Sequence, residues 1–297
     1  MLTDPKTAPP LDEPLAASAP VAERLAAELC RRDPETGQTC AWYHGFWQYL
    51  RLFGLVSTPD RHRDFFYQAL RSAARAGGHA RVLVSGSADY AMFAHVLRAY
   101  RREAADLDVT IVDRCPTPLA LCDWYGAVIA HGVRTQACDI LDFESDEPFD
   151  LICTHSFLGQ FDRARRSELA AKWRRLLRPG GLVVTTNRVV AEGGGSIRGF
   201  TAEQAATFRE QVAVEARRQA VLSVGPEELG RRAGLYAKSM RSHPNPTSRE
   251  IVDLLEGAEL SLDEIRFREL PGRLSNAAGG PSTSRAARFA EVVARRV

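Results

Sequence analysis

Between residues 80 and about 187, short apolar runs alternate with stretches whose apolar positions recur at helical spacing. Apolar runs of this length, bounded by polar turns, are typical of strands buried on both faces, and their alternation with helices is typical of a parallel α/β sheet. The predicted strands are 80–85, 107–113, 133–139, 149–155 and 181–187, and the predicted helices are 89–101, 117–131 and 162–177.

The chain before residue 80 has a different pattern. Residues 1–20 are rich in Pro and Ala and are predicted to form a disordered tail. Residues 21–78 are predicted to form an N-terminal helical cap with helices at 21–32, 40–56 and 60–76, the last one ending at Gly77 and Gly78. In the second of these helices, Tyr43, Phe46, Trp47 and Leu50 share one face, a spacing typical of core packing.

After the fifth strand, residues 188–246 are polar and helical, with a glycine run at 193–195. The sequence Thr201-x-x-Gln204 predicts a capping box that starts a long helix, and a second helix is expected from Pro226. A further capping box starts helix 247–257, and the runs 261–270 and 287–296 predict a closing antiparallel hairpin. We therefore expect a domain over 79–297, in which 188–246 is a helical insertion that forms a lid or an interface.

Composition narrows the class of protein. Apolar residues make up 45% and charged residues 26% of the 297 positions, and the net charge of +2 gives no bulk attraction to nucleic acid. Neither an apolar run of about 20 residues nor a signal-peptide pattern is present, so no membrane partner and a cytoplasmic location are expected. The six cysteines show no C-x-x-C pair and no zinc-like spacing, which predicts a reduced protein without metal.

The candidate chemistry lies at the ends of the predicted strands. In an open α/β sheet the ligand site lies outside the carboxyl ends of the strands. The first strand runs into Ser85-Gly86-Ser87-Ala88, a turn of small residues that lets backbone approach a ligand at a helix N-terminus. The second strand ends in Asp113, 27 residues beyond Gly86, where a carboxylate can accept both hydroxyls of a ribose.

The third predicted strand ends in Asp139-Ile140, which offers a carboxylate to an exocyclic amine and an apolar surface to an adenine ring. Taken alone, Gly86 fits an ordinary tight turn, Asp113 a helix cap and Asp139 a solvated strand end. Their joint order in one β–α–β–α–β unit favours a nucleoside site instead.

With these residues, the chain resembles the class I S-adenosylmethionine-dependent methyltransferases over residues 80–187 and the closing hairpin. The string Arg178-Pro179-Gly180-Gly181 before the fifth strand is the most specific match. The resemblance implies a Rossmann-like, seven-stranded, mostly parallel sheet with helices on both faces and a reversed final hairpin. It further implies that S-adenosylmethionine binds here and leaves as S-adenosylhomocysteine.

The cofactor residues follow from the same resemblance. The backbone near Gly86 would face the methionine moiety, Asp113 would bind the ribose, and Asp139 with Ile140 would flank the adenine. The remaining residues implied at the cofactor are Ser85, Ser87, Ala88, Arg114, Thr154 and His155.

The first motif departs from the family pattern. Val84 stands where the family usually has an acid, and Ala88 and Tyr90 replace two glycines. Asp89 or a residue of the N-terminal helices is a candidate to replace the missing acid. Tyr90 would either narrow the methionine pocket or pack beneath it.

Acceptor chemistry in this family sits at the end of the fourth strand, Thr154-His155-Ser156-Phe157. An Asn-Pro-Pro-Tyr string and an acidic cluster for magnesium are both missing from the sequence. His155 is therefore the candidate catalytic base, since an imidazole can deprotonate a hydroxyl or thiol near neutral pH; the alternative is a histidine that only lines the pocket. Tyr43, His44 and Trp47 are candidate substrate contacts, because N-terminal extensions often roof the acceptor site in this family.

The function expected is methylation of a small molecule, with an oxygen acceptor slightly favoured over nitrogen or sulfur. The altered first motif keeps open a second hypothesis, a non-catalytic S-adenosylmethionine-binding or partner subunit of the same fold. A nicotinamide-dependent oxidoreductase is disfavoured by the missing G-x-G-x-x-G. The aromatic N-terminal helices and the inserted helices could also form a homodimer interface.

Overall fold

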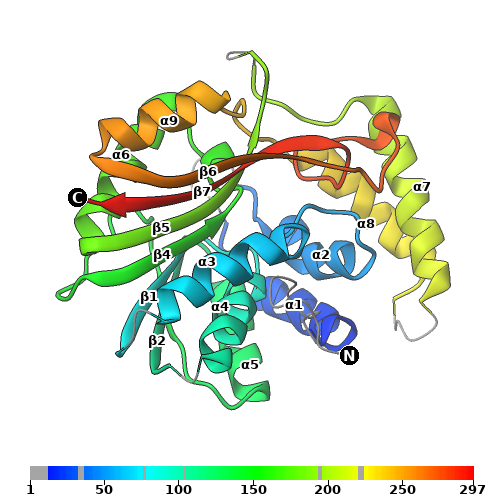
Figure 1. Ribbon diagram of the computed structural model, residues 1–297. Helices are drawn as coiled ribbons and strands as arrows, with labels where there is room; N and C mark the ends of the chain where they lie inside the picture. Colours follow the sequence, from blue (N-terminus) through cyan, green and yellow to red (C-terminus); the bar gives the residue numbers. More distant parts are fainter. Residues whose placement is uncertain (1–12, 33–36, 76–77, 104, 193–195, 220–223) are drawn as a thin grey trace, which may run out of the picture.

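The structure is a computed structural model that describes residues 13–32, 37–75, 78–103, 105–192, 196–219 and 224–297. Its centre is a seven-stranded sheet of order β3-β2-β1-β4-β5-β7-β6 (Figure 1). The strands are β1 (Ala80–Ser85), β2 (Leu107–Asp113), β3 (Arg134–Ala137), β4 (Phe149–His155), β5 (Leu177–Val189), β6 (Leu260–Leu270) and β7 (Ala287–Arg296).

Strands β1 to β5 are parallel, and β7 inserts between β5 and β6 antiparallel to both. The order reverses at β1, whose neighbours are β2 on one side and β4 on the other. The prediction of a Rossmann-like, mostly parallel seven-stranded sheet with a reversed hairpin is confirmed. In such a sheet the crevice outside the strand ends at the reversal is the expected ligand site.

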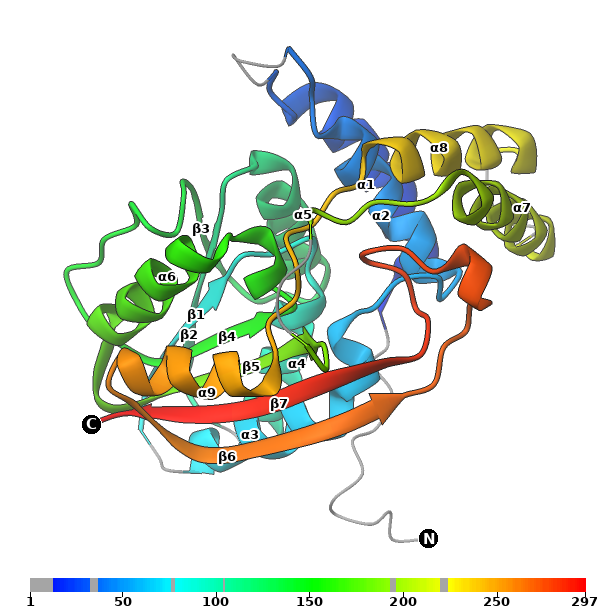
Figure 2. The same ribbon diagram turned by 90° about the horizontal axis from the view of Figure 1, so that it is seen from above.

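Helices cover both faces of the sheet, as Figure 2 shows, with α6 and α9 on one side and α3 and α4 on the other. The helices described are α1 (Leu15–Leu29), α2 (Ala41–Leu52), α3 (Arg63–Arg75), α4 (Ala91–Arg102), α5 (Pro116–Val128), α6 (Arg163–Leu176), α7 (Ala202–Arg218), α8 (Pro226–Ser239) and α9 (Ser248–Gly257). Alternation along β1 explains the two layers: Val82 and Val84 pack with α3, α4 and α5, whereas Leu83 packs with α6 and α9.

Four helices form a second body beside the sheet: α1, α2, α7 and α8. We call these four helices the helical cap, which differs from the N-terminal cap predicted over residues 21–78. Phe46 of α2 shares one buried cluster with Phe208 of α7 and Tyr236 of α8. Figure 1 shows α2 lying between the sheet and α8. We call the chain before β1 the N-terminal arm. This arm and the segment predicted as an insertion, 188–246, therefore pack on each other. The proposed domain boundaries stay predictions.

The connection between β6 and β7 reaches across to the N-terminal arm. The backbone N–H of Ser57 donates to the carbonyl of Ser282 over 3.0 Å, and that of Ser284 donates to the carbonyl of Leu55 over 3.2 Å. An isolated antiparallel bridge joins Val56 to Thr283. The last hairpin of the chain is thus bonded to a segment near its start.

The predicted tail at 1–20 is wrong for residues 15–20, which are helical in α1. Pro20 lies inside this helix, where its ring removes a single backbone hydrogen bond. Burial of Ser18 and Ala19 against the rest of the molecule offsets that loss. Residues 1–12 and the glycine run 193–195 lie outside the described residues.

Other element bounds differ by a few residues. The strand expected at 133–139 is only Arg134–Ala137, an edge strand with mostly exposed side chains. The strand expected at 181–187 extends to Leu177–Val189, because it pairs with both β4 and β7. The helix expected from residue 60 begins as a 3-10 turn at Pro59–His62. Both capping boxes form as predicted, at Thr201 and Thr247.

Candidate functional site

A cavity of about 850 Å³ lies between the carboxyl ends of the central strands and the helical cap. Its walls combine strand ends, α2, the segment after α8 and the connection before β7. Of the residues singled out in the sequence, it is lined by Tyr43, His44, Trp47, Gly86, Ser87, Ala88, Asp113, Arg114, Asp139, Ile140 and His155. One cavity therefore unites the predicted cofactor residues with the predicted acceptor residues.

The turn after β1 depends on Gly86. Its φ of +75° lies in the left-handed region, which favours glycine. A Cβ built there would lie 2.2 Å from the ring of Phe157, which stands against the glycine backbone. The small residue thus makes room for the Phe157 ring, which any side chain at residue 86 would displace.

Asp113 anchors this turn from the end of β2. Its Oδ2 accepts the backbone N–H of Ser87 over 3.0 Å, and its Oδ1 accepts that of Cys115 over 2.8 Å. Burial raises the pKa of Asp113, and these two N–H groups oppose the rise by stabilising the carboxylate. Because each carboxylate oxygen has a further lone pair, Asp113 can still accept two ribose hydroxyls.

Asp139 follows β3 at the same edge. Its Oδ1 accepts the backbone N–H of Leu141 over 3.0 Å, and its Oδ2 lies 3.1 Å from a guanidinium nitrogen of Arg165. The Arg114 guanidinium lies 4.0 Å from the same carboxylate, and its side chain is largely exposed. Ile140, beside it, is buried. Asp139 thus presents a polar group to the cavity, and Ile140 presents an apolar surface beside it.

His155 ends β4 on the acceptor side of the cavity. Its Nδ1 lies 2.7 Å from the Oγ1 of Thr186, and its Nε2 lies 3.3 Å from the Oγ of Ser156. Burial lowers the pKa of His155 well below its ordinary range, and the nearby His62 lowers it further. The imidazole is therefore neutral at pH 7. Ser156 has a φ of +53°, an uncommon backbone conformation of the kind found at functional sites.

Two predicted cofactor residues do not line the cavity. Ser85 is fully buried, and its Oγ accepts the indole N–H of Trp173 over 3.0 Å. Thr154 is also fully buried, and its Oγ1 has no hydrogen-bond partner among the described residues. The predicted cofactor contact of these two residues is therefore not one that their side chains make from the wall of this cavity. Residues next to each other in a strand point to opposite faces, so a strand end cannot offer all its side chains to one ligand.

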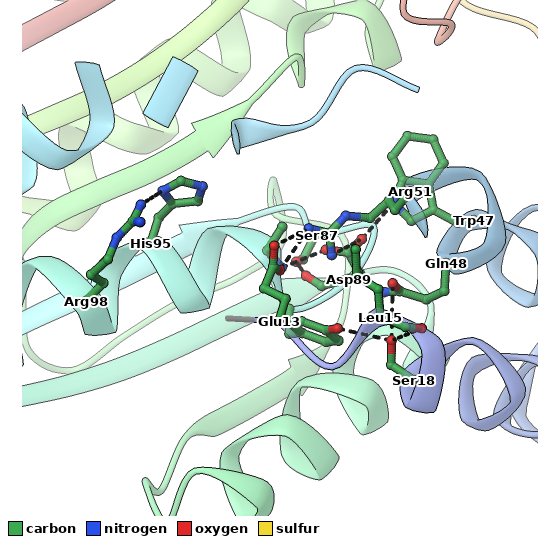
Figure 3. A network of polar contacts seen from close by, with 12 residues as sticks. Glu13, Leu15, Ser18, Trp47, Gln48, Arg51, Ser87, Asp89, His95 and Arg98 are labelled. Atoms are coloured by element: carbon green, nitrogen blue, oxygen red, sulfur yellow. Dashed lines mark hydrogen bonds and ion pairs between the residues drawn. The ribbon is translucent and has the colours of Figure 1, made fainter. Parts of the chain in front are cut away.

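The departures in the first motif have a structural explanation. Asp89 is buried and accepts the indole N–H of Trp47 over 2.7 Å, while a guanidinium nitrogen of Arg51 lies 3.2 Å from it (Figure 3). Its carboxylate thus joins the turn to α2. Tyr90 packs beneath the turn, with its ring stacked on Tyr125 at a centroid distance of 4.3 Å, and does not narrow the cavity.

The aromatic residues of α2 form a stacked series under the helical cap. Tyr43 stacks on Trp47 at 5.1 Å and on Tyr236 of α8 at 6.0 Å between ring centroids. Tyr236 was not singled out in the sequence, and neither was Arg188, which lines the cavity. No local pattern marks them, because topology alone brings them to this place.

Four residues of metal-ligating type lie together in the structure, although the sequence has no zinc-like spacing. The ligand atoms of Cys30, Cys40, His44 and Cys115 all lie within 4.8 Å of one another. These residues come from three separate segments, so no short motif records the cluster. Cys122 and Cys153, in contrast, are buried in the core as expected of small apolar residues.

Comparison with known proteins shows which protein family part of the chain resembles. Residues 89–185 match the family model described as a methyltransferase domain, which is about a third of the chain. Among the curated protein sequences compared with the chain, none matches.

Solved structures align with most of the chain at low identity. The N-methyltransferase NodS from Bradyrhizobium japonicum WM9 is 16% identical, with 80% of this chain and 97% of NodS covered and a TM-score of 0.44. A putative methyltransferase from Bacillus halodurans C-125 is 14% identical, with coverage of 77% and 98% and a TM-score of 0.47. A putative O-methyltransferase from Nostoc punctiforme PCC 73102 is 14% identical, with coverage of 95% and 69% and a TM-score of 0.44.

The strand order, with a cavity at the sheet's reversal point, is that of a Rossmann-like α/β fold. Over residues 89–185 the chain is similar to a methyltransferase domain. Within the part of the chain that the structure describes, no helix is both long and apolar enough to cross a membrane.

Proposed function

We propose that this protein transfers the methyl group of S-adenosylmethionine to a small-molecule acceptor held in the cavity beneath the helical cap. The observation that carries the proposal is the shared cavity: Gly86, Asp113 and Asp139 line it together with His155 and the aromatic residues of α2. A donor at the strand ends and an acceptor under the cap would thus occupy adjacent parts of one enclosure, as transfer in line requires.

The residues present fit the cofactor. Gly86 lines the cavity with backbone alone, and Asp113 keeps acceptor capacity for two hydroxyls. When bound, S-adenosylmethionine supplies a methyl group on a cationic sulfonium. Ser87, Ala88 and Arg114 would complete the wall around it, whereas Ser85 and Thr154 would support it only through the sheet.

His155 is proposed as the group that accepts the acceptor's proton. Thr186 can accept a hydrogen bond from Nδ1–H, which leaves the Nε2 lone pair free of a proton. Its lowered pKa keeps the imidazole neutral but makes it a weak base, so alignment of the acceptor supplies much of the rate. This arrangement suits a hydroxyl acceptor of some acidity, such as a phenol.

Arg188 points to an acceptor with an anionic group. Burial, together with the charges of the neighbouring Arg285, Arg198 and Arg61, lowers the pKa of Arg188 to about 10. Its guanidinium donates to the carbonyls of Pro281 and Thr283, and among the described residues it has no ion-pair partner. Because a buried cation without a counter-ion is costly, an acceptor carboxylate would be bound well here.

Tyr43 and Trp47 are proposed as acceptor contacts, since both rings line the cavity. His44 also lines it, but its Nδ1 lies 3.6 Å from the sulfur of Cys30, so this nitrogen belongs to the cysteine cluster. A cytoplasmic location, the absence of a nucleic-acid partner and a homodimer through the aromatic helices remain part of the proposal.

A second candidate is a non-catalytic S-adenosylmethionine-binding or partner subunit. It is favoured by one observation: Asp89 is already paired with Arg51 and Trp47, so it does not replace the acid that Val84 lacks. Binding without turnover on any acceptor would support this candidate.

The deciding experiment is isothermal titration calorimetry with S-adenosylmethionine and S-adenosylhomocysteine. We expect dissociation constants of about micromolar for the wild type and at least about a tenfold loss for Asp113→Asn. Asp108→Asn is the matched control, because Asp108 lies on the same strand but at its opposite end, paired with Arg134 on the surface. Absence of binding at about millimolar ligand would contradict the proposal.

If both ligands bind, release of S-adenosylhomocysteine is then measured with a panel of phenols, carboxylic acids, amines and thiols. Turnover confined to anionic hydroxyl acceptors, with a raised KM for Arg188→Met, would support the acceptor assignment. Turnover confined to neutral amines would contradict it.

A further inference from the structure

Four side chains of metal-ligating type converge where the helical cap meets the sheet: Cys30, Cys40, His44 and Cys115. Cys30 follows the end of α1, Cys40 and His44 start α2, and Cys115 precedes α5. Cys115 is buried and the other three are half-buried. The cluster thus lies at the seam between the N-terminal arm and the strand that carries Asp113.

The spacing of the ligand atoms is that of a tetrahedral site. The sulfur of Cys115 lies 3.7 Å from that of Cys30 and 3.5 Å from that of Cys40, and the Cys30 sulfur lies 3.6 Å from the Nδ1 of His44. Zinc–sulfur bonds of about 2.3 Å and zinc–nitrogen bonds of about 2.05 Å at tetrahedral angles require sulfur–sulfur edges of about 3.8 Å and sulfur–nitrogen edges of about 3.6 Å. A disulfide needs about 2.05 Å, so these sulfurs are not bonded to each other.

The helix starts leave two of the sulfurs available as ligands. Cys40 and Cys115 are the N-cap residues of α2 and α5, and neither side chain makes a capping hydrogen bond. The Oγ1 of Thr117 lies 3.1 Å from the Cys30 sulfur, where its hydroxyl can donate and orient that ligand from outside the site.

The backbone holds the four residues in place independently of any ion. An antiparallel bridge between Arg32 and Thr39 brings the two ends of the segment between Cys30 and Cys40 together. The N–H of His44 donates to the carbonyl of Cys40 over 3.1 Å, which closes the first turn of α2. The N–H of Cys115 donates to the carboxylate of Asp113 over 2.8 Å.

We propose that Cys30, Cys40, His44 and Cys115 bind one structural zinc ion that fastens the N-terminal arm to the cofactor edge of the sheet. Three sulfurs and one imidazole nitrogen form a donor set that selects zinc among common divalent ions. The four protein ligands complete the tetrahedron, so no position is left for water or substrate and the ion is structural. Asp113, two residues from Cys115, would be held by it indirectly.

This inference goes beyond methyl transfer and does not depend on it. The full chain is purified under reducing conditions without chelator, and its metal content is measured by inductively coupled plasma mass spectrometry. We expect roughly one zinc per chain in the wild type and less than about a tenth in Cys40→Ser and Cys115→Ser. Cys138→Ser is the matched control, since Cys138 is also half-buried but lies outside the cluster.

A second measurement covers variants that fail to fold. Wild-type protein is loaded with cobalt(II), and we expect the visible absorption of a tetrahedral cobalt–thiolate site, removed by one equivalent of zinc. Chelator treatment is expected to lower the thermal unfolding temperature of the wild type and leave that of Cys115→Ser unchanged.

Two results would overturn the proposal. The first is wild-type protein that holds less than about a tenth of an equivalent of zinc after reconstitution and gives no tetrahedral cobalt spectrum. The second is a Cys40→Ser variant that is folded and retains a full equivalent of zinc.

Discussion

A guanidinium nitrogen of Arg51 lies 3.2 Å from the carboxylate of Asp89, so a helix of the N-terminal arm is ion-paired with the turn that follows the first strand. A second nitrogen of the same guanidinium donates to the carboxylate of Glu13 over 2.8 Å (Figure 3). All three side chains are less than 10% exposed. The arm is thus joined to the candidate cofactor turn by a buried charge network.

Replacement of Arg51 by Met should destabilise the fold strongly. It would leave Asp89 and Glu13 buried without a counter-ion, a change that typically costs about 3–5 kcal/mol of unfolding free energy. Arg231→Met is the control, because Arg231 pairs with Glu228 on the surface and its loss should have little effect. Chemical denaturation measures both, and equal effects of the two substitutions would contradict the role assigned to the network.

Gly86→Ala should remove cofactor binding while the chain still folds. The added methyl would meet the Phe157 ring, and the alanine would have to adopt a left-handed backbone conformation. We expect the dissociation constant of S-adenosylhomocysteine to rise by at least about tenfold. Gly132→Ala, where the new Cβ has no neighbour within 4 Å, should bind as the wild type does. Calorimetry of both variants, with circular dichroism to verify folding, is the measurement.

His95 should make the fold sensitive to acid. It is fully buried in α4, and burial, followed by the charge of Arg98, lowers its pKa well below the ordinary value. Its Nδ1 lies 3.1 Å from a guanidinium nitrogen of Arg98, so this ring nitrogen accepts and must be unprotonated (Figure 3). Below about pH 6.5 the unfolded chain binds a proton that the folded chain does not, so the unfolding free energy falls as pH falls.

His95→Asn should reduce that acid dependence, because an amide does not titrate. The free energy of unfolding is measured from pH 7.5 to pH 5 for both proteins, and the slopes are compared rather than the absolute values. Each buried neutral histidine contributes at most about 1.4 kcal/mol per pH unit in this window. His79→Asn, at an exposed position, is the control. An unchanged slope in His95→Asn would mean that His95 takes up its proton without cost.

His155→Gln should slow methyl transfer to a hydroxyl acceptor without weakening cofactor binding. Removal of a general base typically lowers kcat by about 10²–10⁴-fold. Because the pKa of His155 is lowered, the wild-type rate should stay constant down to about pH 6.5 as far as this group is concerned. A wild-type rate that falls with a midpoint above pH 7, and a variant that lacks this fall, would show a histidine of ordinary or raised pKa instead.

The sheet was predictable because its signal is local. Strands β1, β2 and β4 have the predicted bounds, since runs such as 80–85 need apolar side chains on both faces. Asp113 and Asp139 could be placed at the cavity for a related reason: Asp113 ends β2, and Asp139 follows β3 at the same edge of the sheet. Helix starts at Thr201 and Thr247 followed from capping chemistry confined to four residues.

The remainder required the tertiary structure. Which side of β1 Ser85 faces depends on pleat and register, and the sequence alone placed it at the ligand when it bonds Trp173 instead. The Cys30–Cys115 contact joins residues 85 positions apart, so no spacing rule could indicate it. Whether Tyr90 narrows the pocket or packs beneath it became clear only from its stacking on Tyr125.

The bonding of the β6–β7 connection to residues 55–57 sets a condition on how the chain can be made. Ser57 receives its partner, Ser282, only after a further 225 residues have been synthesised. Until then, residues 55–57 lack the β6–β7 connection that they bond to, and the sheet lacks β7, which lies between β5 and β6. Contacts of such long sequence separation slow folding and leave apolar surface open meanwhile. The emerging polypeptide therefore leaves this apolar surface exposed until the segment with Ser282 and β7 has been synthesised.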